Sequence, residues 1–278
     1  MTRVLSTAHL TAIELSPPEL VHAGAHYGLN SVGVRVHPAT STESSYPMTP
    51  GSDMVLATQQ ACDESGVKIL DIEVFGLAPH INREAWLPVL EVGQQLGASI
   101  LNVVGTDSNL DRFRDKLGVL VQDAQNFGIR PSMEPISYQA LSSFETARKI
   151  AAETGAGIMV DTLHVFRSGT QLSVLAELPP NVVTVIQLCD GLWAEPTELD
   201  ESVAMPLGQS VGGAPREFEA RAYRRIPGAG EFPLNKVLEL FPEAPVSIEV
   251  PDVRAVRAAG LEAHLTNCIA STRALIEQ

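Results

Sequence analysis

The sequence predicts an α/β protein, a single-domain (β/α)8 TIM barrel that spans residues 1–278. Three observations predict this fold. Short apolar runs alternate with helix-like segments without a break in composition, and strict alternation of strand and helix implies a parallel sheet. Glycines recur between the helix-like segments and the next apolar run at a spacing of about 30 residues, the size of one βα unit. The length of 278 residues is typical of a barrel that forms one domain.

The apolar runs are interpreted as buried parallel strands, because such strands are hydrophobic on both faces. Eight of them imply a closed barrel, and a doubly wound open sheet with fewer strands is the alternative. The predicted strands are Val4–Ala8, Ser31–Val36, Lys68–Phe75, Ser99–Gly105, Ile129–Glu134, Gly157–Asp161, Val183–Leu188 and Val246–Val250.

Capping residues and glycines mark the helices between these strands. Prolines follow Ser16 in the first turn of the first helix, where their missing N–H costs little. Glycine after a helix relieves the steric cost of the left-handed conformation, and the predicted positions are Gly28, Gly66, Gly97, Gly128 and Gly155. The predicted helices are Pro17–Tyr27, a segment from Ser52 or Asp53 to Ser65, one from about Asn82 to Leu96, Leu110–Phe127, Ser143–Thr154, Gln171–Leu178, Pro233–Leu240 and Val253–Ile276.

One connection, at about residues 190–231, is abnormally long, because βα loops usually have about 2–6 residues. Long loops in compact domains are often functional, so we expect a lid over the barrel mouth. The segment carries Arg216, Arg221, Arg224 and Arg225. We expect Arg224 or Arg225 to contact a carboxylate or phosphate of the substrate.

Four successive predicted strands carry a polar residue at or next to their carboxyl end: Glu134, Asp161, Gln187 and Glu249. Any one of them could merely cap its strand, but buried charges are usually paired or bind a metal. Catalytic groups of a barrel lie at these carboxyl-terminal strand ends. Three carboxylates and one amide oxygen suit Mn²⁺ or Mg²⁺, with Co²⁺ as a further option. The pattern therefore predicts a divalent metal centre.

Composition excludes several other classes of protein. The net charge of -14 disfavours a nucleic-acid partner. Three widely spaced cysteines form no CxxC pair and predict neither a disulfide framework nor a zinc ribbon. No apolar run is long enough for a membrane span, and the N-terminal residues lack the apolar region of a signal peptide. We therefore expect a cytoplasmic protein without a membrane partner.

Nearly the whole chain resembles the xylose isomerase-like TIM-barrel superfamily, which includes sugar phosphate isomerases and epimerases and related 3-dehydroshikimate dehydratases. The motifs that carry the resemblance are Met133-Glu134-Pro135, Asp161-Thr-Leu-His164, Gln187-Leu-Cys-Asp190, Pro227-Gly228-Ala-Gly230-Glu231 and Ile248-Glu249-Val250. The resemblance places the metal ligands on the same four residues: Glu134, Asp161, Gln187 and Glu249. It implies that His164 contacts the ligands or the substrate.

The resemblance implies a divalent-metal-dependent isomerase or epimerase that acts on a keto-sugar or cyclic polyol. Its implied chemistry is proton abstraction next to a metal-polarised carbonyl, with Glu134 and Glu249 as the base and acid pair. Glu73, which closes the third apolar run, is expected to orient the substrate or to fasten a loop. Barrels of this kind often dimerise, so a homodimer is one expected assembly.

Gln187 departs from the epimerase pattern, where a histidine usually stands at this position. Glutamine there resembles the dehydratases, so a metal-dependent lyase of the 3-dehydroshikimate or inosose dehydratase type is the alternative. A DNA-repair barrel of the endonuclease IV type is disfavoured by the acidic charge and the few scattered histidines. A barrel that has lost its metal and its catalytic activity is disfavoured by the complete ligand set.

Overall fold

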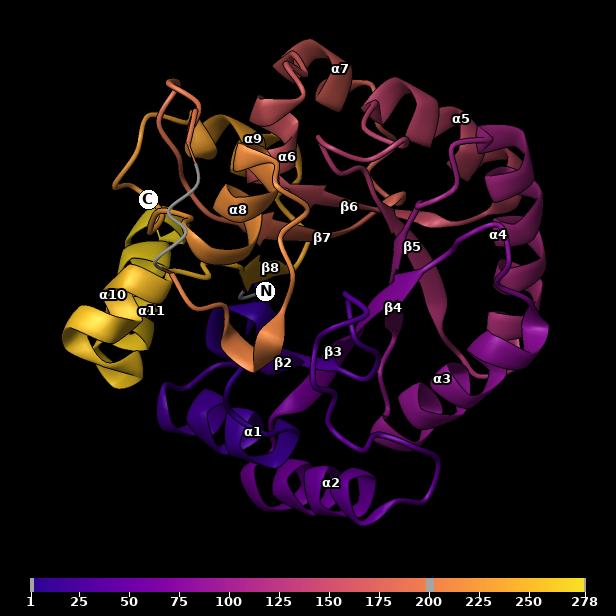
Figure 1. Ribbon diagram of the computed structural model, residues 1–278, viewed down its shortest axis with the longest axis horizontal. Helices are drawn as coiled ribbons and strands as arrows, with labels where there is room; N and C mark the ends of the chain where they lie inside the picture. Colours follow the sequence, from indigo (N-terminus) through magenta and orange to yellow (C-terminus); the bar gives the residue numbers. More distant parts are fainter. Residues whose placement is uncertain (1–2, 199–202, 278) are drawn as a thin grey trace.

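The computed structural model describes residues 3–198 and 203–277, and eight parallel strands form one sheet with helices around its outside (Figure 1). The strands follow the order β1-β8-β7-β6-β5-β4-β3-β2. Their bounds are β1 Leu5–Thr7, β2 Ser31–Arg35, β3 Lys68–Gly76, β4 Ile100–Val104, β5 Arg130–Glu134, β6 Gly157–Asp161, β7 Val183–Leu188 and β8 Val246–Ile248.

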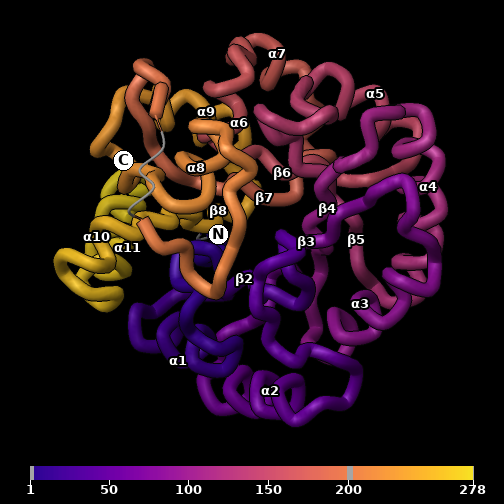
Figure 2. The backbone as a smooth tube through the Cα atoms, in the orientation of Figure 1, coloured from indigo at the N-terminus to yellow at the C-terminus, as the bar shows by residue number. Residues whose placement is uncertain are grey.

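The two ends of this sheet meet at β1 and β2 and close the barrel. The amide N of Asn30 donates to the carbonyl of Leu5 at 3.0 Å, and the amide N of Leu5 donates to Asn30 Oδ1 at 2.9 Å. The backbone trace shows the resulting ring of strands (Figure 2). The predicted (β/α)8 barrel and its eight strands are confirmed, with differences of one or two residues at the strand ends.

Helices follow the strands and pack on the outside of the barrel. The predicted helix-ending glycines all have positive φ, with values of 65° to 80° at Gly28, Gly66, Gly97, Gly128 and Gly155. The helices are α1 Pro17–His26, α2 Asp53–Ser65, α3 Arg83–Leu96, α4 Leu110–Gln125, α5 Phe144–Thr154, α6 Thr162–Arg167, α7 Leu172–Ala176, α8 Pro215–Ala222, α9 Leu234–Leu240, α10 Val253–Ala259 and α11 Leu261–Ile276, with 3-10 turns η1 His9–Ala12 and η2 Pro206–Gly208.

Three helical features differ from the sequence prediction. The single helix predicted over Val253–Ile276 is wrong, because Gly260 adopts φ 87° and ψ 157° and separates α10 from α11. This conformation is open to glycine and lies outside the helical region. The helices α6 and α8 were not predicted, because each is short and α8 lies in the arginine-rich connection where apolar periodicity is weak.

The long connection forms contacts across the barrel mouth. The amide N of Ser44, in the loop after β2, donates to the carbonyl of Leu207 at 2.8 Å. The amide N of Ser210 donates to Thr40 Oγ1 of the same loop at 3.3 Å. In Figure 1 this orange segment, with α8, lies in front of the strands near β7 and β8. Its function as a lid remains a prediction.

Both ends of the connection are fastened to the strand end after β7. The Asp190 carboxylate accepts hydrogen bonds from four backbone N–H groups, at 2.8 to 3.0 Å. The donors belong to Gly191, Gly228, Gly230 and Phe232. One buried carboxylate therefore orders the glycine-rich turn that follows Arg224 and Arg225.

The apolar core lies mainly between the sheet and the helices, while a smaller cluster of Ile100, Met159 and Val185 fills part of the barrel interior. Among residues 3–198 and 203–277, no helix has the length and hydropathy that a membrane span requires.

Candidate metal centre and active site

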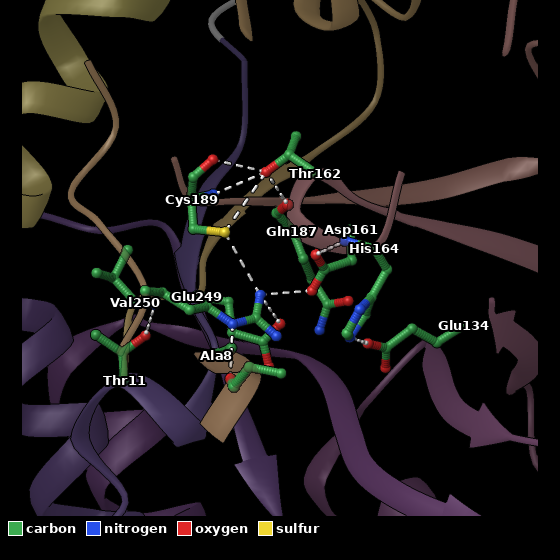
Figure 3. A network of polar contacts seen from close by, with 12 residues as sticks. Ala8, Thr11, Glu134, Asp161, Thr162, His164, Gln187, Cys189, Glu249 and Val250 are labelled. Atoms are coloured by element: carbon green, nitrogen blue, oxygen red, sulfur yellow. Dashed lines mark hydrogen bonds and ion pairs between the residues drawn. The ribbon is translucent and has the colours of Figure 1, made fainter. Parts of the chain in front are cut away.

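The predicted metal ligands meet at the carboxyl-terminal ends of the strands (Figure 3). Glu134 ends β5, Asp161 ends β6, Gln187 lies near the end of β7, and Glu249 follows β8. All four side chains are buried. Glu134, Asp161 and His164 can place three ligand atoms within 4.8 Å of one another. This cluster contains two of the four predicted ligands, Glu134 and Asp161. Gln187 is the register partner of Asp161, and Arg224 Nη1 lies 2.6 Å from Asp161 and 3.2 Å from Glu249.

The strand β6 passes directly into the helix α6 at Asp161, and this transition positions His164. Asp161 is the N-cap of α6, and its Oδ1 accepts a hydrogen bond from the His164 backbone N at 3.1 Å. One helical turn then directs the His164 ring towards Glu134, with Nε2 at 3.7 Å from Oε1. Ser137 Oγ lies 3.2 Å from the other ring nitrogen. The D-x-x-H motif therefore caps α6 through Asp161 and places both Asp161 and His164 in the site.

Arg224 is buried against the same carboxylates. Its Nη1 donates to Asp161 Oδ2 at 2.6 Å and lies 3.2 Å from Glu249 Oε2 without the alignment of a hydrogen bond. Its Nε donates to the carbonyl of Ala220, which lies in α8 four residues earlier in the chain, at 2.8 Å. The long connection thus brings Arg224 to the site, where it contacts Asp161 and Glu249.

Burial and crowding of negative charge shift the pKa values of the site carboxyls. Burial, together with Asp161, raises the pKa of Glu134 to about 7. Burial raises the pKa of Glu249 well above its usual value, although Arg224 opposes this. Burial would also raise the pKa of Asp161, but Arg224 and His164 hold it below its usual range. Burial lowers the pKa of His164 to about 4, so its imidazole is neutral at pH 7.

The donor set fits a divalent cation. Gln187 Oε1 and Glu249 Oε2 are buried and have no hydrogen-bond partner among the described residues. Buried acceptors without a donor are rare in folded proteins and are usually explained by a bound ion or water. Carboxylate, amide and imidazole groups are all ligands of first-row divalent ions. The same side chains could therefore hold the predicted ion.

A cavity of about 410 Å³ opens above these groups. Glu134, His164, Arg224 and Glu249 line its inner part, and loop residues such as His37, His80 and Tyr138 line the rest. The volume is within the range of pockets for small organic ligands. The candidate site is therefore a ligand-sized space with titratable groups at one end.

The remaining predicted residues occupy different places. Glu73 lines the cavity, and its Oε1 accepts a hydrogen bond from the His9 backbone N at 2.9 Å, so it also fastens η1. Arg225 does not belong to the cavity lining; its backbone N and O pair with those of Asp190. Substrate binding by Glu73, Arg224 or Arg225 remains a prediction.

Sequence reasoning missed three residues of the site. Asn102 Nδ2 donates to Glu134 Oε2 at 2.8 Å, and Arg35 lies 3.3 Å from Glu43 and 3.8 Å from Glu73. Asn102 interrupts the apolar run of β4 and Arg35 closes that of β2, so the argument used for the four strand-end residues would have found both. Glu43 lies in an irregular loop and has no comparable signal.

Comparisons with known proteins agree with this architecture. A family model described as xylose isomerase-like TIM barrel matches residues 21–265. No curated protein sequence matches the chain.

Solved structures similar to the model share its fold at low sequence identity. An IolI protein with a bound zinc atom is 15% identical, with a TM-score of 0.74 and coverage of 99% of this chain and 98% of that one. A xylose isomerase domain-containing protein from Salmonella typhimurium is 14% identical, with a TM-score of 0.72 and complete coverage of both chains. A D-psicose 3-epimerase crystallised with D-fructose is 12% identical, with a TM-score of 0.70 and complete coverage of both chains. The family match covers most of the sequence, and the chain belongs to the xylose isomerase-like TIM barrel family.

Proposed function

We propose that this protein is a divalent-metal-dependent isomerase or epimerase that acts on a keto-sugar or cyclic polyol. The observation that carries the proposal is that Glu134, Asp161, Gln187 and Glu249 lie at neighbouring strand ends next to the cavity, which Glu134 and Glu249 line. Gln187 Oε1 and Glu249 Oε2 are buried there and have no hydrogen-bond partner among the described residues. The similar D-psicose 3-epimerase, crystallised with D-fructose, supports a sugar substrate. Mn²⁺ or Mg²⁺ is the proposed ion, and the zinc in the similar IolI protein keeps Zn²⁺ among those to be tested.

The proposed ligands also determine the proposed chemistry. A divalent ion held by Glu134, Asp161, Gln187 and Glu249 would act as a Lewis acid that makes the C–H next to a substrate carbonyl more acidic. Glu134 and Glu249 line the cavity on different strands, so one can remove a proton from a bound carbon and the other can return one. Arg224, whose guanidinium lies between Asp161 and Glu249, would hold these carboxylates in place.

Solvent deuterium tests the reaction class. Enzyme loaded with Mn²⁺, Mg²⁺, Co²⁺ or Zn²⁺ is incubated in D₂O with keto-sugars and inososes, and the products are analysed by mass spectrometry and NMR. An isomerase or epimerase gives a product of unchanged composition with deuterium at the carbon next to the carbonyl. Glu134→Gln should abolish exchange, whereas the exposed Glu153→Gln should retain it. If no such carbon exchanges its proton with any of these compounds, the proposal is wrong.

A metal-dependent dehydratase is the second candidate, and Gln187 at the third ligand position favours it. In that case the same proton abstraction is followed by loss of a β-hydroxyl group. The D₂O experiment with 3-dehydroshikimate or an inosose would then give a product lighter by one water. The product would also absorb in the ultraviolet, because the new double bond is conjugated with the carbonyl.

A further inference from the structure

The barrel interior immediately below the candidate site is polar on one side. Alternate residues of a strand face the same side of a sheet. The inward-facing residues at and just below the cavity lining therefore include Ser247, Ser6, Gly33, Asp71, Asn102 and Ser132, on six neighbouring strands from β8 through β1 to β5. They do not all lie at one depth, because Asn102 itself lines the cavity and Asp71 is in register with Ile100 of β4. We call these six residues the polar half-layer.

Small polar residues are unusual at this depth, because barrel interiors are normally filled with bulky branched side chains. Only the opposite side follows that rule, with Met159 and Val185 in contact with Ile100. Every member of the polar half-layer other than Gly33 carries a buried polar side chain. The polar half-layer therefore offers several buried polar atoms, most of them on small side chains.

Four side-chain oxygens of the polar half-layer have no hydrogen-bond partner among the described residues. They are Ser6 Oγ, Asp71 Oδ1, Asn102 Oδ1 and Ser247 Oγ, and Ser31 Oγ, further down the inner face of β2, is a fifth. Asn102 already uses its Nδ2 to donate to Glu134, so its free oxygen can only accept. Leaving such an atom unpaired costs about 1–3 kcal/mol. A hydrogen-bond donor or a cation between these side chains would remove this cost.

The Asp71 carboxylate lies against the backbone of β2. A Cβ atom on Gly33 would be 2.8 Å from Asp71 Oδ1, which no real Cβ tolerates. Gly33 is thus the residue that allows this approach, and it brings the carboxylate towards the strand that carries Ser31. Ser6 and Ser247 are register partners on β1 and β8, so two further oxygens lie side by side in the same part of the wall.

Charge in this region is unbalanced. Six buried carboxylates, Glu43, Asp71, Glu73, Glu134, Asp161 and Glu249, face two buried guanidinium groups, Arg35 and Arg224. If all six carboxylates are ionised, a divalent ion at the strand ends still leaves two negative charges. Arg35 is engaged by Glu43 and Glu73, and Asp71 has no ion-pair partner among the described residues. Burial, together with Glu73 and Glu134, raises the pKa of Asp71 well above its usual value, as expected for a carboxyl without a cation.

We propose that four residues of the polar half-layer, without Gly33 and Ser132, bind one monovalent metal cation, Na⁺ or K⁺, with Asp71 as the charged ligand. Ser6, Ser247 and Asn102 supply neutral oxygens. A single carboxylate among neutral oxygens suits a monovalent ion, whereas the three carboxylates at the strand ends suit a divalent one. The cation neutralises Asp71 below Glu134 and holds the Asn102 amide that donates to Glu134.

Thermal unfolding in different chloride salts tests the site without substrate or divalent metal. Chelator-treated full-length protein is unfolded in KCl, NaCl and choline chloride at equal ionic strength. We expect Tm to rise by about 2–4 °C in KCl or NaCl relative to choline chloride, because an ion that binds only the folded state stabilises it. Asp71→Asn should lose this response. Ser132→Ala is the matched control and should keep it, because Ser132 Oγ already donates to the Arg130 carbonyl.

Crystals soaked in Tl⁺ provide an independent readout, with an anomalous peak expected next to Asp71 Oδ1. Equal Tm values in all three salts would overturn the proposal, and so would electron density for an ordinary water without an anomalous signal. Either result would indicate a protonated Asp71 with bound water. If Asp71→Asn does not fold, Ser247→Ala serves instead and should raise the cation concentration needed for half of the Tm rise by several-fold. A negative result leaves the proposed function untouched, because neither divalent metal nor substrate takes part in these measurements.

Discussion

The buried ion pair between Arg167 on α6 and Glu219 on α8 allows a sharp test of how the long connection is held on the barrel. Arg167 Nε and Nη2 donate to the two Glu219 oxygens at 2.7 and 2.6 Å, and the side chains are 2% and 7% exposed. Arg167→Met keeps much of the side-chain volume but leaves the Glu219 carboxylate buried without its partner. Such a change costs about 3–5 kcal/mol, which corresponds to a Tm decrease of about 6–20 °C.

The same helix provides a matched control. Arg216 donates to Glu195 in the same two-pronged geometry, at 2.6 and 2.7 Å, but these side chains are 37% and 41% exposed. Exposed pairs contribute about 0.2–1 kcal/mol, so Arg216→Met should have a small effect. The two ion pairs share donor, acceptor and geometry and differ in burial, while Arg167 also donates to the Leu192 carbonyl at 2.8 Å. The double-mutant cycle with Glu219 separates that contact from the ion pair.

Urea unfolding followed by tryptophan fluorescence measures both losses, and Glu219→Gln in the wild-type and Arg167→Met backgrounds completes a double-mutant cycle. We expect the Arg167→Met loss to shrink when Glu219 is also neutralised, because the uncompensated charge is then absent. Equal losses for Arg167→Met and Arg216→Met would refute the reasoning that burial decides the magnitude.

Three further changes have defined outcomes. Replacing both Glu134 and Glu249 with alanine should abolish activity and lower the divalent-metal content, and full occupancy by elemental analysis would contradict the assigned ligands. Asn102→Leu removes the donor to Glu134 and should weaken metal affinity, measured by calorimetry, by about 10- to 100-fold; an unchanged affinity would show that the hydrogen bond is dispensable. His9 is buried, and burial lowers its pKa to about 3. As the pH falls below 6.5, His9 becomes protonated in the unfolded state but stays neutral in the folded state, so the free energy of unfolding decreases. Relative to His9→Gln, the wild type should lose roughly 2 kcal/mol between pH 6.5 and about pH 4.5 in urea unfolding, and parallel curves would exclude this linkage.

The strands and the strand-end residues could be predicted from sequence because one physical rule governs both. A strand buried on both faces must be apolar, so a polar residue at its end is conspicuous, as at Glu134 and Asp161. The same rule applied to Arg35 and Asn102 would have extended the site.

Other features depend on contacts between distant segments. Glu43 is buried because it bonds the Arg35 guanidinium, and its own neighbours in sequence contain no sign of this. The helix α8 is stabilised by Arg167, which lies in a different βα unit. The break at Gly260 could not be predicted, because a glycine inside an apolar periodic pattern is compatible both with one continuous helix and with two separate helices.

The four hydrogen bonds to Asp190 have a consequence for how this protein can change. They fix the residues just after β7 and the turn that follows Arg225 to the same point, so the chain between them begins and ends at one place. The entropy of closing such a loop grows only slowly with its length. Insertions, deletions or grafted sequences that keep Arg224, which pairs with Asp161 and Glu249, can therefore reshape this part of the cavity lining while the candidate metal-binding strand ends stay in place. Exchange of this segment between related barrels is a direct route to new substrate selectivity.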